Sequence, residues 1–366
     1  MKVLILLHSL DKFAGGVERR TSELETNLPD DIKREYLLFK NIVSLPHKGK
    51  INFIKSLKIP KFILKNKKKL KFLAYFFGFL ILFYRIYQVK KFLQNNDFNV
   101  ILAIDDYFGL IGVLSGIDNL IVSVRNYPEI LYQNSLIHLL PDFVYKKVYP
   151  KLIKNKKIKI HVVSKCIKKY LKEKYDLNSF VIYNLFEIEK IRSLAAENIE
   201  FDFEYFINIG HLNHQKNQKD LIYAYKILKE HGIKEKLLII GDGEKKEELK
   251  NLIKELNLEN DIFLLGKKEN PYKYLKRAKF YISTSLYEGF PGVFVEANIL
   301  KVPIISYNFK CGAEELAVYL SKKNPESLAK KILEVKNLKT YHFKNVDVSK
   351  NTIIKKWIKI FKEFNV

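Results

Sequence analysis

Acidic residues are missing from one long stretch of this sequence, and cysteine is scarce throughout it. No Asp or Glu occurs between Glu35 and Asp97. The chain has only two cysteines, Cys166 and Cys311, and their separation matches neither a metal-ligand motif nor a redox motif. The sequence is therefore unlike a disulfide-rich secreted scaffold or a cysteine-based zinc domain.

Long uncharged runs are also missing. The longest, Phe72 to Tyr84, has thirteen residues, whereas a membrane-spanning helix needs about 20 apolar residues. The first residues, "MKVLILLHSL", lack the small-residue cleavage site of a signal peptide. We therefore expect a cytoplasmic protein that is peripheral to the inner face of the cell membrane.

Positive charge is abundant, with 65 Lys and Arg against 40 Asp and Glu and a net charge of +25. Such an excess of positive charge suggests nucleic acid, anionic lipid or phosphate-bearing substrates as partners. Lysines gather in the acid-free segment 36–96 around the apolar run 72–84. This combination predicts a surface that binds anionic membranes. The alternative is that 72–84 is a buried helix and the lysines are solvated.

The order of apolar runs predicts an α/β fold. A chain of 366 residues suggests two domains, and short β-branched runs alternate with amphipathic segments, as in parallel sheets flanked by helices. The predicted strands are 2–7, 35–39, 98–104, 120–124, 159–164 and 180–183, then 205–210, 236–241, 261–266, 279–284 and 302–306. Predicted helices include 16–28, 68–93, 165–175 and 352–364.

This pattern divides the chain into two doubly wound parallel-sheet domains. We place the first over 1–183, a linker over 184–204, the second over 205–350, and a C-terminal helix that packs back on the body over 351–366. In such sheets, ligands bind beyond the carboxyl ends of the strands. The loops that directly follow the strands should therefore carry the function.

The segment "SLYEGFPGVFVEA" (285–297) holds two glutamates around a turn. Gly289, Pro291 and Gly292 form the turn, and a helix follows, so free backbone N–H groups are expected to bind an anion such as phosphate. Because carboxylates repel phosphate, Glu288 and Glu296 are better suited to accept hydrogen bonds from hydroxyl groups. A ligand with hydroxyls on both sides of a diphosphate is a nucleotide sugar. The alternative is a turn with two solvated glutamates.

Two further loops follow predicted strands. Gly210 ends a strand, His211 follows it, and Lys216 lies in a polar loop before a helix, where it can serve as a point charge for phosphate. In the first domain, Gly15 and Gly16 allow a close backbone approach at a helix start, although the full G-x-G-x-x-G fingerprint is absent.

Together these segments resemble the retaining glycosyltransferases of family 4, with the two-Rossmann GT-B architecture, over nearly the whole chain. The resemblance rests on Gly15-Gly16, "GHLNHQKNQ" (210–218), "IIGDGEKKEEL" (239–249), "SLYEGFPGVFVEA" (285–297) and "CGAEEL" (311–316). It implies two Rossmann-like domains facing a central cleft, and an enzyme that transfers a hexose or N-acetylhexosamine from a nucleotide sugar, with UDP as the preferred nucleotide.

The resemblance also implies roles for single residues. Glu296 would hold the ribose hydroxyls and Glu288 the hydroxyls of the donor sugar, while Lys216 would neutralise the departing diphosphate. The backbone at Gly289, Phe290, Pro291 and Gly292 would meet the diphosphate from one domain, and Gly16 from the other. The family commonly has arginine where this chain has His211, a weaker and pH-dependent phosphate contact.

The expected acceptor is a hydroxyl of a lipid-linked oligosaccharide or of a lipopolysaccharide or capsule-type glycan. Asp106 and Arg125 follow first-domain strands and are candidates for the acceptor site. We expect no required cofactor, no metal ion and no specific nucleic acid. Two alternatives remain: a nucleotide-sugar epimerase on the same fold, and a basic nucleic-acid- or membrane-binding protein with a vestigial donor site.

Overall fold

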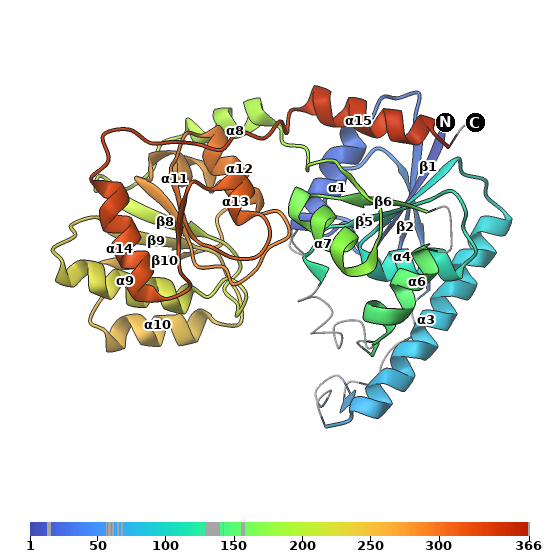
Figure 1. The fold of residues 1–366 in the computed structure, drawn as a ribbon, viewed down its shortest axis with the longest axis horizontal. Helices are drawn as coiled ribbons and strands as arrows, with labels where there is room; N and C mark the ends of the chain where they lie inside the picture. The colour runs from blue at the N-terminus through green and yellow to red at the C-terminus, as the bar shows by residue number, and fades with distance from the viewer. Residues whose placement is uncertain are drawn as a thin grey trace. The chain divides into compact units, whose positions relative to one another are not determined.

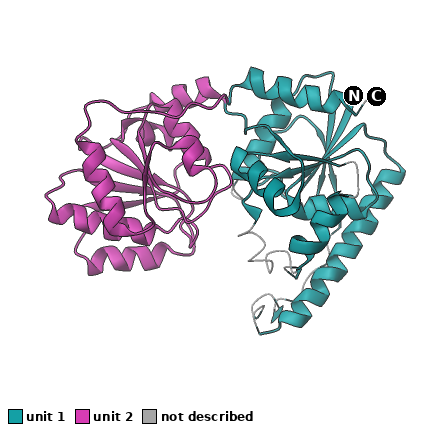
Figure 2. Cartoon of the chain, viewed as in Figure 1, with its two compact units in different colours: residues 1–186, 348–366 teal, residues 187–347 magenta. Residues whose placement is uncertain are grey.

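The computed structural model describes residues 1–12, 16–55, 57, 60, 62–63, 66, 69–128, 140–141, 143–154 and 158–364. These residues form two compact units, 1–186 with 348–366, and 187–347 (Figure 2). The predicted boundaries differ from these units, with a linker over 184–204 and a second domain that ends at 350. The helix α8 (Ile188–Ala195) lies inside that predicted linker and is part of unit 2.

Unit 1 contains one parallel sheet of seven strands in the order β3-β2-β1-β4-β5-β6-β7. The strands are β1 (Lys2–Leu7), β2 (Lys33–Leu38), β3 (Lys50–Phe53), β4 (Val100–Ile104), β5 (Leu120–Val124), β6 (Lys159–Val162) and β7 (Phe180–Val181). The central strands β4 and β5 are buried along their whole length, which agrees with their nearly continuous apolar sequence.

The helices of unit 1 cover both faces of this sheet. They are α1 (Gly16–Asn27), α3 (Lys71–Gln94), α4 (Asp106–Leu114), the π-helix η2 (Val144–Val148), α6 (Tyr149–Lys154), α7 (Lys165–Tyr175) and α15 (Lys350–Lys362). Side chains of α1 and α15 share one apolar core with the strands, and the fully buried Trp357 of α15 is part of it. The other face is covered by α3, α4 and α6 (Figure 1).

Unit 2 contains a parallel sheet of six strands in the order β10-β9-β8-β11-β12-β13. The strands are β8 (Tyr205–Ile209), β9 (Lys236–Ile240), β10 (Ile262–Gly266), β11 (Phe280–Ser283), β12 (Ile304–Tyr307) and β13 (Tyr319–Ser321). The helices α9 (Gln218–Glu230), α10 (Lys246–Glu255) and α14 (Pro325–Lys336) cover one face. On the other face lie α8, α11 (Tyr272–Arg277), α12 (Gly292–Ile299) and α13 (Ala313–Leu316) (Figure 1).

One buried charge in unit 2 is held by two lysines. The side chain of Glu235 is 2% exposed and accepts hydrogen bonds from Lys279 Nζ at 2.8 Å and from Lys336 Nζ at 2.9 Å. Desolvation raises the pKa of Glu235. These two hydrogen bonds, a backbone hydrogen bond and the charge of Lys279 together outweigh desolvation and lower the pKa to about 2. The carboxylate is therefore ionised in the folded protein at neutral pH.

The predicted doubly wound α/β fold is confirmed, with differences at its edges. The short edge strands β3 and β13 are missing from the prediction because three or four residues carry too little periodicity to identify. The predicted helix 68–93 is α3, observed over Lys71–Gln94. Residues 56, 58, 59, 61, 64, 65, 67 and 68 of the predicted basic segment 36–96 lie outside the described residues.

The helix α3 is longer and more apolar than the uncharged run suggests. It has 24 residues and is long and apolar enough to cross a membrane, judged by length and composition alone. Core helices of soluble proteins pass the same test, and 28% of its most apolar window is buried. The run 72–84 is thus only part of the apolar helix, because the apolar pattern continues past Arg85.

Candidate active site

The predicted donor-site loops follow two neighbouring strands in the middle of the unit 2 sheet. From β8 the sheet continues through β9 in one direction, and from β11 through β12 in the other. The strand order reverses between β8 and β11, and such switch points form the ligand-binding crevices of open α/β sheets. The loop after β8 carries Lys216, and the loop after β11 carries Glu288.

Backbone and side-chain hydrogen bonds join these two loops. Thr284 Oγ1 donates to the carbonyl oxygen of Lys216 at 3.0 Å, and the backbone N–H of Leu286 donates to the carbonyl oxygen of Gln215 at 2.8 Å. The N–H of Lys216 donates to Asn213 Oδ1 at 3.0 Å. The backbone that carries Lys216 is therefore fixed against the loop that carries Glu288.

Lys216 and Glu288 form an ion pair. The Nζ–Oε1 distance is 2.6 Å, with the side chains 23% and 11% exposed. The Nε2 of Gln215 donates to the carbonyl oxygen of Tyr287 at 2.9 Å and lies 3.4 Å from Glu288 Oε2. The side chain of Lys216 passes over Gly210, where an added Cβ would lie 3.4 Å from Lys216 Cε, an ordinary van der Waals distance. The structure therefore brings the cation and the first predicted glutamate together.

The turn after Glu288 ends in a helix N-terminus. Gly289, Phe290 and Pro291 lead into α12, which begins at Gly292 with Pro291 as its N-cap. The first turn of a helix has backbone N–H groups without intrahelical acceptors, which suits a phosphate oxygen. A Cβ at Gly312, where φ is +86°, would lie 2.7 Å from Pro291 Cδ. The loop before α13 thus packs closely against this turn.

Glu296 lies on α12, one turn beyond Gly292, and is 6% exposed. Its Oε1 accepts a hydrogen bond from the hydroxyl of Tyr272 at 3.2 Å. Burial raises the pKa of Tyr281 in β11, and the negative charges of Glu288 and Glu296 raise it further. Both glutamates therefore lie close enough to act on the same phenol.

The ion pair does not include the other predicted residues. His211 is exposed, and its Nε2 is 3.8 Å from Glu244 Oε2. Gly16 is the exposed first residue of α1 in unit 1, and Gly15 lies outside the described residues. Asp106 is 2% exposed within the first turn of α4, and Asp105, the N-cap of α4, is the residue that directly follows β4.

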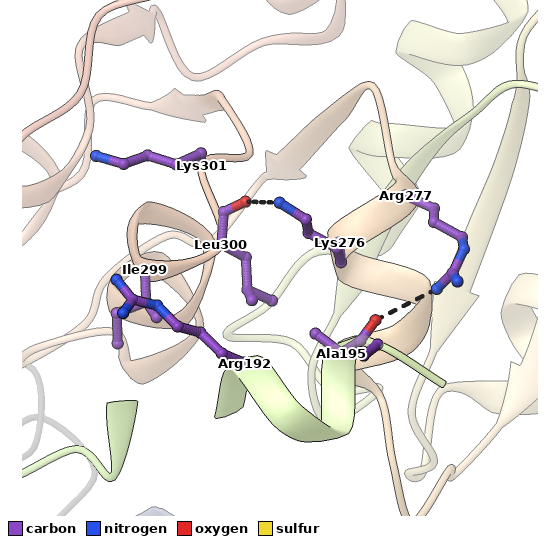
Figure 3. Close-up of a pocket in the computed structure, with 8 residues that line it drawn as sticks. Arg192, Ala195, Lys276, Arg277, Ile299, Leu300 and Lys301 are labelled. Atoms are coloured by element: carbon purple, nitrogen blue, oxygen red, sulfur yellow. Dashed lines mark hydrogen bonds between the residues drawn. The ribbon is translucent and has the colours of Figure 1, made fainter. Parts of the chain in front are cut away.

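A pocket of about 580 Å³ lies at the C-terminal ends of α8, α11 and α12 (Figure 3). Two of its cations are bonded to helix-terminal carbonyl groups. Lys276 Nζ donates to the carbonyl oxygen of Leu300 at 3.1 Å, and Arg277 donates to that of Ala195 at 3.3 Å. These contacts cap helix ends, and the pocket lining contains none of the predicted donor-site residues.

Sequence reasoning missed Gln215 and Tyr272. Gln215 stands in the quoted polar loop, one residue before Lys216, but nothing in the sequence indicates that its amide reaches the loop after β11. Tyr272 reaches Glu296 only because α11 packs beside α12. Within the described part of the chain, no group of three or more His, Cys, Asp or Glu side chains could hold a metal ion.

Comparisons with known proteins identify the family. The profile described as glycosyl transferases group 1 matches residues 190–352. An uncharacterized glycosyltransferase of Methanocaldococcus jannaschii is 32% identical over 277 residues, which are 70% of this chain and 66% of that protein. The chain belongs to the glycosyl transferases group 1.

A second relative of this glycosyltransferase matches over most of both chains. It is the N-acetylgalactosamine-N,N'-diacetylbacillosaminyl-diphospho-undecaprenol 4-alpha-N-acetylgalactosaminyltransferase of Campylobacter jejuni. The two are 29% identical over 328 residues, which are 86% of this chain and 83% of the relative.

Solved structures confirm the GT-B fold of this glycosyltransferase. Anabaena HepE, in complex with UDP and glucose, matches 99% of both chains with a TM-score of 0.69 and 16% identity. A mutant of S. aureus TarM, in complex with fondaparinux, alpha-GlcNAc-glycerol and UDP, matches 98% of this chain and 99% of TarM with a TM-score of 0.70 and 14% identity.

Proposed function

We propose that this glycosyltransferase transfers a hexose or N-acetylhexosamine from a UDP-sugar to a hydroxyl group of a lipid-linked or polymeric glycan acceptor, with retention at the anomeric carbon, as in family 4. The observation that carries the proposal is the Lys216–Glu288 ion pair at the switch point of unit 2, beside the N-terminus of α12. A site for a nucleotide sugar must combine a cation that binds the diphosphate with hydrogen-bond acceptors for the hydroxyl groups.

The residues present suit a diphosphate leaving group. The N–H groups at Gly292 and the ammonium of Lys216 would bind the diphosphate oxygens, and Glu296 would accept hydrogen bonds from the ribose. Lys216 has three N–H donors, so it can bind phosphate while it keeps its ion pair with Glu288 and orients that side chain. Glu288 would then accept from a hydroxyl of the donor sugar.

Charge stabilisation is then the main catalytic task. The bond between the anomeric carbon and the diphosphate oxygen breaks, and its electron pair stays on the diphosphate, where Lys216 stabilises the added charge. The acceptor oxygen bonds to the anomeric carbon on the same face, and its proton passes to the leaving diphosphate. In this proposal no divalent ion or cofactor is needed for the step.

Relatives support a phosphate-bearing acceptor. The Campylobacter relative acts on a diphospho-undecaprenol-linked sugar. Two other relatives, 28% identical over 170 and 163 residues, are a poly(ribitol-phosphate) alpha-N-acetylglucosaminyltransferase and a poly(glycerol-phosphate) alpha-glucosyltransferase. We propose that the acceptor of this chain likewise carries phosphate near the sugar or polyol that is modified.

We also propose that α3 binds the cytoplasmic face of the membrane, as part of the basic segment 36–96. Its exposed large apolar side chains recur every three or four residues, at Phe72, Phe76, Leu80, Phe83 and Tyr87, so they lie on one face of the helix. The helix carries no acidic residue. An apolar stripe with basic surroundings suits an anionic bilayer.

The opposite face of α3 favours a helix that lies on the membrane over one that crosses it. Ala74, Gly78, Ile81, Ile86 and Val89 are buried, and α3 packs against α4 within unit 1. A spanning helix would expose this face to lipid and separate it from α4. Release of the protein from membranes by high salt or carbonate would agree with peripheral binding, whereas resistance to both would indicate a spanning helix.

The test of the proposed function is nucleotide release from UDP-, GDP- and ADP-sugars, with and without a membrane lipid extract. We expect release from one UDP-sugar that requires the extract and is lost in Glu296→Ala. Glu334→Ala, an exposed glutamate of α14, is the matched control and should keep full activity. Free sugar without extract would support hydrolysis or an epimerase-type reaction, and absence of release and of nucleotide binding would contradict the proposal.

A further inference from the structure

Unit 1 contains a buried arginine that forms no ion pair with any carboxylate among the described residues. Arg125 directly follows β5 and is 7% exposed. Its Nε donates to Ser123 Oγ at 3.1 Å, and one terminal nitrogen donates to Asn184 Oδ1 at 3.2 Å. A guanidinium has five N–H donors, and the other three have no hydrogen-bond partner in the described part of unit 1. Burial of a charge lowers the stability of the folded protein unless an opposite charge or further hydrogen bonds compensate the loss of solvation.

Neutral groups hold this guanidinium in place. Ser123 Oγ lies 2.8 Å from His161 Nδ1, and His161 Nε2 lies 2.8 Å from the carbonyl oxygen of Ile182. Because that carbonyl can only accept, Nε2 carries the proton, and Nδ1 accepts from Ser123. Burial lowers the pKa of His161 to about 3, and the charge of Arg125 contributes. The network therefore fixes Arg125 without neutralising it.

Arg125 lies in the part of the unit 1 sheet where a ligand is expected. The strand order reverses between β1 and β4, and β5 pairs with β4. Asp105, which follows β4, has φ of +83° and caps α4 by accepting from the N–H groups of Tyr107 and Phe108. A non-glycine residue with such a φ is strained and typical of functional sites.

The acids around Arg125 compensate its charge only in part. Burial raises the pKa of Asp105 to about 8, so this carboxyl is largely protonated at neutral pH. Burial also raises the pKa of Glu18, while the charge of Arg125 lowers it. Within the described residues, no carboxylate oxygen lies within ion-pair distance of Arg125. The site thus retains positive charge that an anion could neutralise.

The helix α3 reaches this same edge of the sheet. A terminal nitrogen of Arg85 donates to the hydroxyl of Tyr107, on α4, at 2.9 Å. Partial desolvation lowers the pKa of His8, which follows β1, and the charges of Arg85 and Lys40 lower it further. Arg85, which belongs to the same helix as the apolar stripe, therefore lies close to the residue that follows β1. A lipid-borne phosphate group could reach the sheet edge from that helix.

We propose that Arg125 binds a phosphate group of the acceptor and so selects phosphate-bearing acceptors. This inference rests on the proposed function. A guanidinium binds two oxygens of a phosphate at once, and the partnerless N–H groups of Arg125 provide for this. The phosphate could come from a lipid-linked diphosphate or from a polyol-phosphate polymer. Arg125 here determines specificity and takes no part in bond breaking.

The test compares Arg125→Met, Arg125→Lys and the control Arg192→Met, which removes an exposed arginine of α8. Binding of farnesyl diphosphate, glycerol 1-phosphate and methyl glucuronide is measured by calorimetry with the donor site saturated by UDP. We expect Arg125→Met to weaken binding of one phosphate probe by about 10- to 100-fold, Arg125→Lys to weaken it less, and Arg192→Met to leave it unchanged. UDP affinity should stay the same in all three variants.

Thermal unfolding distinguishes a binding role from a structural one. Replacing an uncompensated buried charge by Met should leave the Tm unchanged or raise it. A large fall in Tm with unchanged probe binding, or an Arg125-dependent affinity for methyl glucuronide alone, would overturn the proposal. If the affinity for farnesyl diphosphate depends on Arg125, the phosphate comes from a lipid-linked acceptor. If the affinity for glycerol 1-phosphate depends on Arg125, the phosphate comes from a polyol-phosphate acceptor. Failure of the wild type to bind UDP would instead contradict the proposed donor, independently of Arg125.

Discussion

Replacing Lys216 by Met should weaken UDP binding through the loss of its contact with the diphosphate. A charge-assisted hydrogen bond contributes about 1.5–3 kcal/mol, which corresponds to about a 10- to 150-fold change in the dissociation constant. A second effect adds to this. Glu288 loses its 2.6 Å ion pair and, among the described residues, keeps only the longer 3.4 Å contact with Gln215, so its uncompensated charge would also repel the phosphate.

The double variant Lys216→Met/Glu288→Gln separates these two effects. Titration of UDP by calorimetry needs no acceptor and gives each affinity directly. If Lys216 contacts the diphosphate, the double variant should bind UDP about 10- to 150-fold more weakly than Glu288→Gln alone. Lys219→Met, which removes an exposed lysine three residues further along, should bind UDP like the wild type. Equal affinities for the double variant and Glu288→Gln would mean that Lys216 only neutralises Glu288, and would refute the reasoning.

Three further predictions concern stability and membrane binding. At Gly241 an added Cβ would lie 1.8 Å from a backbone carbonyl oxygen, so Gly241→Ala should lower the free energy of unfolding in urea by several kcal/mol. Gly232 has a φ of +77° and open space around it, so the control Gly232→Ala should lower the free energy of unfolding by only about 1–2 kcal/mol. The pKa of Glu235 is about 2, below the ordinary value of 4.5. The ionised carboxylate therefore contributes fully to stability above about pH 5, and this contribution is lost as the pH falls toward 2. The stability difference between wild type and Glu235→Gln should therefore shrink over that range, and a constant difference would contradict it. Phe83→Ser should weaken binding to vesicles with anionic lipid about tenfold or more, while Leu338→Ser, an exposed leucine of unit 2, should have no effect.

The sequence predicts the arrangement of strands around the candidate site better than its contacts. Lys216 and Glu288 are expected at the same edge because each follows a buried parallel strand, and β8 pairs with β11. Their direct contact was not predicted, because it depends on the conformation of two loops. The hydrogen bond from Tyr272 to Glu296 was missed for a similar reason, since it arises only when α11 packs beside α12.

The length of the apolar helix and the environment of Arg125 could also not be predicted from the sequence. A count of uncharged residues ended the apolar run at Tyr84, but a helix presents different faces, and basic residues such as Arg85 can lie along an apolar stripe. Arg125 is identifiable in the sequence as the residue after a strand. Its burial and its neutral partners depend on β6 and on Asn184, far along the chain.

The chain path through the two units has a consequence for synthesis. Trp357 and Phe361 complete the apolar core on one face of the unit 1 sheet, yet they follow the whole of unit 2, residues 187–347. At about 5–20 residues per second, a ribosome takes roughly 10–30 s to make that insertion. During this interval one apolar face of the nascent first sheet is covered by α1 but not by α15, whereas unit 2 is contiguous and has all its residues earlier. The second unit of the chain is therefore the first that can finish folding.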